Sequence, residues 1–161
     1  ALFFVGTAFS GAASAAGLVK VKQIVFGMDC APCAHGVEKG LEKLEGVKDA
    51  TVSLNEGYAA VVLTPENSVT LEKIQQVVRE NGFTPKDATV VISGTVAHSN
   101  DHQLILSAGS GQEYPLSAAP ENSTAWQTLQ ALPVGTTVEI KAHLDAGETR
   151  QLVVLEVEPQ V

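Results

Sequence analysis

Cys30 and Cys33 are the only cysteines in the 161-residue chain, and they stand two residues apart in the stretch 27–33. Thiolates at this spacing can close on one soft metal ion, because the thiolate rather than the thiol is the ligand. A strand-like pattern meets a helix-like pattern here. Cys33 is therefore predicted in the first helical turn, where free backbone N–H groups and the helix dipole favour a negative sulfur. Pro32 suits a helix start, because it has no N–H and its φ is preset.

The spacing of the two cysteines is compatible with three kinds of site. A structural zinc site requires four ligands, and the chain has no second cysteine pair, so an open two-sulfur site would suit metal transfer. Proline before the second cysteine is also typical of thioredoxin-type thiol–disulfide motifs, and CxxC is a redox motif in general. A purely structural disulfide is disfavoured, because two cysteines this close enclose a small, strained loop.

The elements that would position the cysteines follow a βαββαβ order over residues 17–87. Alternating apolar residues predict strands at about 19–26, 50–54 and 58–63, with a short fourth strand at about 83–87. Apolar residues at steps of three and four predict helices at about 32–45 and 69–80. Gly46 is predicted as the C-cap of the first helix. This order is that of an α+β, ferredoxin-like fold.

The same stretch resembles the heavy-metal-associated domain family, which includes periplasmic mercuric-ion binding proteins, copper chaperones and the amino-terminal modules of metal-exporting P-type ATPases. The resemblance covers residues 19–87. It implies that Cys30 and Cys33 bind the metal and that Met28 packs inward rather than binding it. The motifs that carry it are Gly27-Met28-x-Cys30-x-x-Cys33, Leu44-Glu45-Gly46-Val47 and Asn81-Gly82-Phe83.

The loop near the metal is also part of the resemblance. In this family an aromatic residue there shields the ion, and a lysine offsets the thiolate charge. Phe83 matches the aromatic position, whereas Lys86 comes a few residues late for the lysine. A separate set of lysines, Lys20, Lys22, Lys39 and Lys43, is a candidate docking face for an acidic partner, although a solvated surface explains most of them.

Asp29 departs from the threonine that the family commonly has at this position. A carboxylate next to two thiolates adds a hard oxygen ligand, which favours divalent ions such as Zn(II) over linear Cu(I) or Hg(II). The alternative is that Asp29 faces water and only caps the following helix. His35 is predicted to be solvated, because two residues along a helix place it roughly 200° round from Cys33.

Residues 88–161 are predicted to form a second domain. Strands at about 89–97, 103–107 and 113–116 precede a helix at about 125–132, and strands at about 138–144 and 152–157 follow it. Three strands, a helix and two strands is the order of an OB-like β-barrel. Nucleic-acid binding is excluded here, because such a barrel needs a basic groove and this segment is acidic. His98, His102 and His143, with Asp101 and Asp145 nearby, are a candidate second metal site; scattered surface histidines are the alternative.

Residues 1–16 are interpreted as part of a secretory signal, because a short apolar run precedes small residues ending at Ala15 and Ala16. The run is too interrupted to be a good spanning helix. We therefore expect a periplasmic or otherwise exported protein with no stable membrane insertion after signal cleavage. A formal net charge of -8 excludes general attraction to nucleic acid or anionic lipid.

The sequence therefore predicts three segments, namely a partial signal peptide at 1–16, a heavy-metal-associated domain at 17–87 and an OB-like domain at 88–161. The predicted function is metal capture by Cys30 and Cys33, with Asp29 as a further candidate ligand. The ion, Cu(I), Zn(II) or Hg(II), would pass by ligand exchange to a metal transporter or another metal-accepting protein, so the chain is not expected to be an enzyme. The alternative is an exported thiol–disulfide oxidoreductase using the same cysteines.

Overall fold

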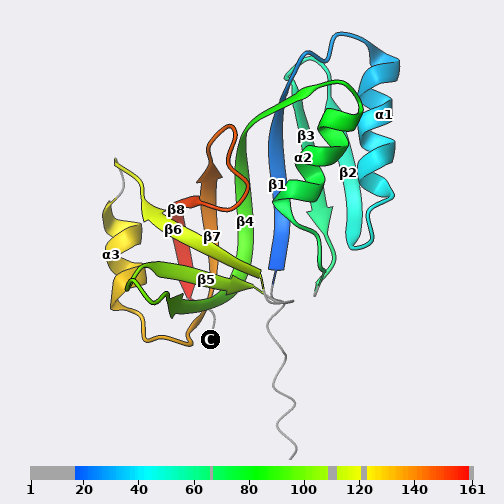
Figure 1. Ribbon diagram of the computed structural model, residues 1–161. Helices are drawn as coiled ribbons and strands as arrows, with labels where there is room; N and C mark the ends of the chain where they lie inside the picture. Colours follow the sequence, from blue (N-terminus) through cyan, green and yellow to red (C-terminus); the bar gives the residue numbers. More distant parts are fainter. Residues whose placement is uncertain (1–16, 66, 109–111, 121–122, 160–161) are drawn as a thin grey trace, which may run out of the picture.

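The computed structural model describes residues 17–65, 67–108, 112–120 and 123–159 of the chain. The predicted signal segment 1–16 lies outside the described residues. Figure 1 shows two halves joined along one long strand. The elements are β1 (Gly17–Phe26), α1 (Ala31–Glu42), β2 (Val47–Ser53), β3 (Tyr58–Leu63), α2 (Leu71–Glu80), β4 (Thr84–His98), β5 (Leu104–Ala108), β6 (Gln112–Ala118), α3 (Ser123–Ala131), β7 (Thr137–Leu144) and β8 (Leu152–Pro159).

The first half confirms the predicted βαββαβ order. Its strands lie in the order β2-β3-β1-β4, with every neighbouring pair antiparallel. Both helices cover the same face of this sheet (Figure 1). Along β1, Val21 and Val25 are buried towards the helices, whereas Lys20 and Lys22 are exposed. This alternation follows from the two-residue period of a strand and fixes which residues face the helices.

Strand β4 belongs to both halves of the molecule. Residues 84–93 pair with β1, and residues 88–95 pair on the other side with β7. Val90 is fully buried and lies opposite Val21 of β1 and Ala142 of β7, so the two halves share one continuous core. The two strands predicted at 83–87 and 89–97 are therefore a single strand, and the predicted boundary between residues 87 and 88 falls inside it.

The second half is a closed five-stranded barrel. Its strands follow the order β4-β5-β6-β8-β7, and β7 pairs back to β4. All neighbouring pairs are antiparallel except β6 and β8, which are parallel. Helix α3 connects β6 to β7 and packs mainly against β8. Three strands, a helix and two strands is the order that the sequence predicted for this segment.

The end of α1 differs from the prediction. The helix ends at Glu42 rather than at residue 45, and Lys43 is its C-cap. Gly46 lies instead in the turn before β2, with φ of +101°. A Cβ atom at this glycine would stand 2.7 Å from Cβ of Asn67, so the close approach of the chain requires glycine here. Among the described residues, no helix has the length and apolarity to cross a bilayer.

Candidate metal centre

Cys30 begins helix α1 and Cys33 lies in its first turn. Cys30 is the N-cap residue, with extended backbone angles, and its Sγ atom accepts a hydrogen bond from the backbone N–H of Cys33 over 3.3 Å. Pro32 occupies the first turn, as predicted for a residue that has no N–H to satisfy. Both cysteines are half-buried. The helix start therefore holds both sulfur atoms where N–H dipoles stabilise negative charge.

The structure joins Cys30 and Cys33 in a disulfide, with Cα atoms 5.3 Å apart. The small loop was expected to disfavour a purely structural disulfide, and the structure shows that this spacing does allow the bond to close. The helix start brings the two Cα atoms within the range of about 4.4–6.8 Å that disulfides usually span. The same closeness places both sulfurs where, once reduced, they could bind one ion. The structure thus holds the two-electron-oxidised form of the predicted metal-binding pair.

The loop 27–30 is supported from below by apolar residues. Met28 is half-buried and packs against the core, which confirms its predicted inward position. Phe83 is packed against the same core and lies beside the loop, since a Cβ atom at Gly27 would stand 3.6 Å from Cδ1 of Phe83. Lys86 instead lies with its Nζ atom 5.6 Å from the centroid of the Phe26 ring.

Asp29 is exposed at the end of the loop. It faces water, as one alternative predicted, but it does not cap α1, because Cys30 is the capping residue. Within the described part of the chain, no three or more His, Cys, Asp or Glu side chains gather as a metal site. The structure therefore brings together the two cysteines, but not Asp29 with them. His35 is exposed on α1, as predicted.

The second metal site considered for the histidines of the barrel is not formed. His98 and His102 line one depression together with Trp126 of α3. His143 lies elsewhere, with its Nε2 atom 3.1 Å from Asp145 and 3.5 Å from Asp87. The topology separates these histidines because His143 lies opposite Thr89, nine residues before His98 on β4.

Two glycines that the sequence reading passed over set the contact between α1 and α2. A Cβ atom at Gly40 would stand 2.7 Å from Cγ1 of Val77, and one at Gly36 would stand 2.9 Å from Oδ1 of Asn81. Their spacing of four residues places them on one side of α1, where only a missing side chain lets the helices approach this closely. The four-residue spacing of the two glycines was the sequence signal for this contact. The contact itself holds α1, the helix that presents the cysteines, against α2.

Two buried glutamines, also missed from the sequence, connect the metal-binding half to its neighbours. Gln23 donates from Nε2 to the carbonyl of Lys86 over 2.7 Å, which ties β1 to the start of β4. Gln75 of α2 donates to the carbonyl of Glu148 over 2.8 Å, in the loop between β7 and β8. A buried amide needs such partners, so Gln23 fixes β1 against the start of β4 within the first half, and Gln75 fixes α2 against a loop of the barrel.

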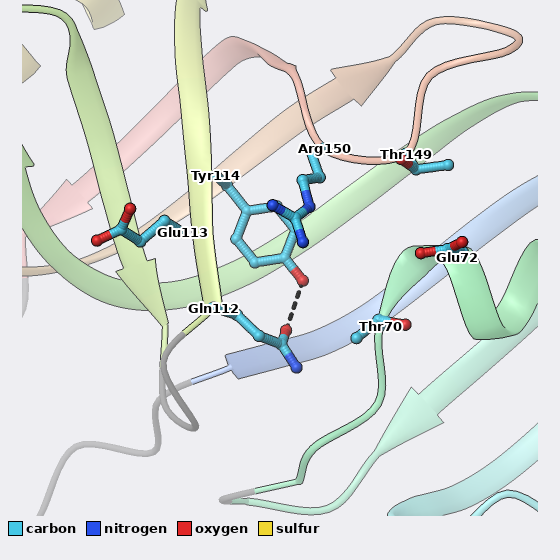
Figure 2. A pocket seen from close by; sticks show the side chains of 7 residues that line it. All are labelled: Thr70, Glu72, Gln112, Glu113, Tyr114, Thr149 and Arg150. Atoms are coloured by element: carbon cyan, nitrogen blue, oxygen red, sulfur yellow. Dashed lines mark hydrogen bonds between the residues drawn. The ribbon is translucent and has the colours of Figure 1, made fainter. Parts of the chain in front are cut away.

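The seam between α2 and the barrel contains a polar depression (Figure 2). Tyr114 is buried in it and donates a hydrogen bond from its hydroxyl to Oε1 of Gln112 over 2.7 Å. Burial raises the pKa of Tyr114 to about 12, against an opposing effect of the Arg150 guanidinium. No sulfur or imidazole lines this depression, so its donor set does not suit a soft metal. Its other lining residues are Thr70, Glu72, Glu113 and Thr149.

Comparison with known proteins places the CxxC half among metal-handling domains. The family model of the heavy-metal-associated domain matches residues 23–84. The copper chaperone CopZ of Staphylococcus epidermidis is 37% identical over 62 residues, which cover 38% of this chain and 90% of the chaperone. The copper-transporting ATPase HMA5 of Oryza sativa subsp. japonica is 44% identical over 62 residues, which cover 38% of this chain and 6% of the ATPase.

The chain thus spans only a small part of that ATPase relative, whereas it spans nearly all of the chaperone. Among solved structures, a copper binding domain from HMA7, a P-type ATPase, has 34% identity and a TM-score of 0.39, over 45% of this chain and 93% of that chain. Cys30 and Cys33 both lie inside the matched residues 23–84. Because the chain covers nearly the whole chaperone at this identity, it belongs to the heavy-metal-associated domain family.

Proposed function

We propose that the protein binds Cu(I) through Cys30 and Cys33 in their dithiol form and passes the ion to a partner protein by ligand exchange. The observation that carries this proposal is the pair of sulfur atoms at the start of α1, with Cα atoms 5.3 Å apart. Membership of the heavy-metal-associated domain family supports metal handling. Relatives named as copper chaperones and copper-transporting ATPases favour copper as the cargo.

The donor set also supports Cu(I) over Zn(II). Thiolates are soft ligands that suit Cu(I), whereas zinc sites in proteins usually have tetrahedral coordination with at least three protein ligands. Asp29 is exposed, and the described residues contain no third side chain of the His, Cys, Asp or Glu type gathered with the cysteines. Hg(II) would suit two thiolates equally well, but the names of the relatives point to copper.

The mechanism follows from the position of the sulfurs. The dithiol is two electrons and two protons more reduced than the disulfide of the structure, and each thiol releases its proton on binding the ion. The N–H groups at the start of α1 stabilise the resulting thiolates. Because both cysteines are half-buried rather than enclosed, a thiolate of the partner can add to the ion before either protein sulfur leaves. The ion then changes protein without becoming free and without a change in oxidation state.

The partner we propose is a metal transporter, because the ATPase relatives contain a segment similar to this chain. We retain export to the periplasm as part of the proposal, on the basis of the apolar segment at 1–16. We further infer that the barrel is of the OB type. Its strand order, its parallel β6–β8 pair and the helix between its third and fourth strands support that assignment.

Anaerobic competition titration of the reduced protein with Cu(I) and a chromophoric chelator tests the proposal. We expect tight binding of one Cu(I) per chain, and loss of tight binding in Cys30→Ser and in Cys33→Ser. His35→Ala is the matched control, because His35 is exposed on the same helix. Full affinity in either serine variant would overturn the two-sulfur site. No tight binding by the wild-type chain, together with thiol-dependent reduction of a disulfide substrate, would favour the oxidoreductase alternative.

A further inference from the structure

Helix α2 ends at an asparagine–glycine pair. Asn81 is the C-cap residue, with φ of -88° and ψ of 6°, and Gly82 follows it with φ of +85°. Both residues are exposed. Apart from atoms of residues 81–83, no heavy atom of the described residues lies within 4 Å of a Cβ atom built on Gly82. Water therefore reaches the peptide bond between the two residues, and no side chain at Gly82 shields it.

An asparagine followed by glycine can lose its side-chain amide. The backbone nitrogen of Gly82 would bond to Cγ of Asn81 while the Cγ–Nδ2 bond breaks, and ammonia would leave with the proton of the Gly82 N–H. Water then opens the resulting cyclic imide at either of its two carbonyl groups. The product is aspartate, or isoaspartate in which the main chain runs through Cγ. Glycine favours the first step, because it places no Cβ atom beside the attacking nitrogen.

Two hydrogen bonds of the helix end hold the reacting groups of this pair apart. The Nδ2 atom of Asn81 donates to the carbonyl of Val77 over 2.8 Å. The N–H of Gly82 donates to the carbonyl of Arg79 over 2.9 Å. With ψ of 6°, the Gly82 nitrogen eclipses the backbone nitrogen of Asn81 rather than its Cβ atom, so ring closure also requires the backbone to rotate. The reaction therefore requires the last turn of α2 to open.

Phe83 holds this last turn closed. Its N–H donates to the carbonyl of Val78 over 3.2 Å, and its ring packs against the core beside Gly27. Proteins open locally at helix ends at a lower free energy than that of complete unfolding. Loss of the Phe83 ring should therefore make the opening of this turn more frequent.

We propose that Asn81 is a deamidation site, at which local opening of the last turn of α2 limits the rate. Conversion removes the amide that donates to Val77 and places a carboxylate at the C-terminal end of a helix, where negative charge is unfavourable. The Oδ1 atom of Asn81 lies 2.9 Å from the position of a Cβ atom at Gly36, so the new charge lies in the contact between α1 and α2. Because hydrolysis of the imide does not restore the amide, the modified chain keeps a weaker contact between these helices.

Incubation of the full chain in mildly alkaline buffer, folded or in guanidinium chloride, followed by peptide mass spectrometry tests the proposal. Trypsin cleaves after Arg79 and Lys86, and the resulting peptide 80–86 has Asn81 as its only asparagine. In the denatured chain we expect Asn81 to convert faster than Asn55, which glutamate follows. In the folded chain Asn81 should convert at least about tenfold more slowly, since an opening cost of ~1.4 kcal/mol gives that factor.

Two variants separate local opening from unfolding of the whole chain. Phe83→Ala should accelerate conversion of Asn81 in the folded protein. Leu129→Ala removes a fully buried side chain of α3, a helix that packs mainly against β8, and should leave the rate unchanged. Equal rates in the folded and denatured wild-type chains would overturn the proposal, as would an unmodified Asn81 in the denatured chain. Acceleration by Leu129→Ala as large as that by Phe83→Ala would overturn it too.

Asn81→Asp tests the consequence for the helix contact. We expect a lower urea midpoint than in the wild-type chain, because the donor to Val77 is lost. Asn55→Asp makes the same charge change in an exposed turn and should leave the midpoint unchanged. An unchanged midpoint in Asn81→Asp would overturn the proposed weakening. None of these measurements uses a metal ion, so they decide this proposal independently of the Cu(I) titration.

Discussion

The backbone N–H of Cys33 donates a hydrogen bond to Sγ of Cys30 over 3.3 Å, so one candidate metal ligand caps the helix that carries the other. The sulfur of Cys30 thus has two tasks. It satisfies an N–H that would otherwise be unpaired at the helix start, and it supplies a thiolate to the metal. Substitutions at this position can separate the two tasks.

Cys30→Ser and Cys30→Ala should both abolish tight metal binding, yet only the alanine variant should lose the helix cap. Serine is a favoured N-cap residue, and replacing such a cap with alanine costs about 0.5–2 kcal/mol. We expect the reduced alanine variant to be less stable than the serine variant by an amount in that range. Urea unfolding followed by circular dichroism measures the difference. Equal stability of the two variants would show that the cap contributes nothing.

Asp29→Thr should leave Cu(I) affinity unchanged, because the carboxylate is exposed and does not gather with the two cysteines. Anaerobic competition titration with Cu(I) and with Zn(II) on the wild-type and variant proteins measures the effect. A selective loss of tight Zn(II) binding would instead support the prediction that Asp29 is a ligand, and it would redirect the proposed function to a divalent ion.

Gly40→Ala should destabilise the protein, because its Cβ would stand 2.7 Å from Cγ1 of Val77. Overpacking typically costs about 1–3 kcal/mol, and the better helix propensity of alanine returns about 1 kcal/mol of that. We expect a net loss of about 1 kcal/mol in the free energy of unfolding. In the double variant with Val77→Ala, the loss due to Gly40→Ala should disappear. A Gly40→Ala variant as stable as wild type would mean that the helices shift apart without cost.

Stability should fall at high pH through Tyr114. Its pKa is raised from the ordinary 10.0 to about 12 in the folded protein, so between these values the unfolded chain releases a proton that the folded chain keeps. The contribution of Tyr114 is fully present below pH 10 and is lost as pH rises towards 12. Titration of tyrosinate absorbance, with Tyr114→Phe as the comparison, measures this. If Tyr114 ionised near pH 10 while the protein stayed folded, burial would not raise its pKa and the prediction would fail.

The sequence predicted well those features that depend on local residue order. Strand β3 has the predicted bounds of 58–63, and α2 ends at Glu80 before the predicted Asn81-Gly82 turn. The cysteines lie at the helix start because Pro32 and the following apolar spacing specify a helix there. These signals depend on residues that are neighbours in the sequence, so a single sequence is enough to detect them.

Features that depend on distant partners were not predicted. The sequence predicted two strands, at 83–87 and 89–97, yet β4 is continuous because β1 and β7 pair with it from both sides. The carboxylate of Asp87 accepts a hydrogen bond from the N–H of Ala146, 59 positions later. The disulfide was likewise misjudged, since its feasibility depends on the Cα separation that the helix start imposes.

Because β4 is shared, residues 88–93 pair with β1 on one side and with β7 on the other, so the two halves overlap there. A cut after residue 87 would remove the strand that faces residues 17–23 of β1. It would leave a row of unpaired N–H and C=O groups, the kind of edge along which chains aggregate. A substitution in the barrel can therefore shorten or lengthen the time for which the metal-binding half stays folded, even where the substituted residue contacts neither cysteine.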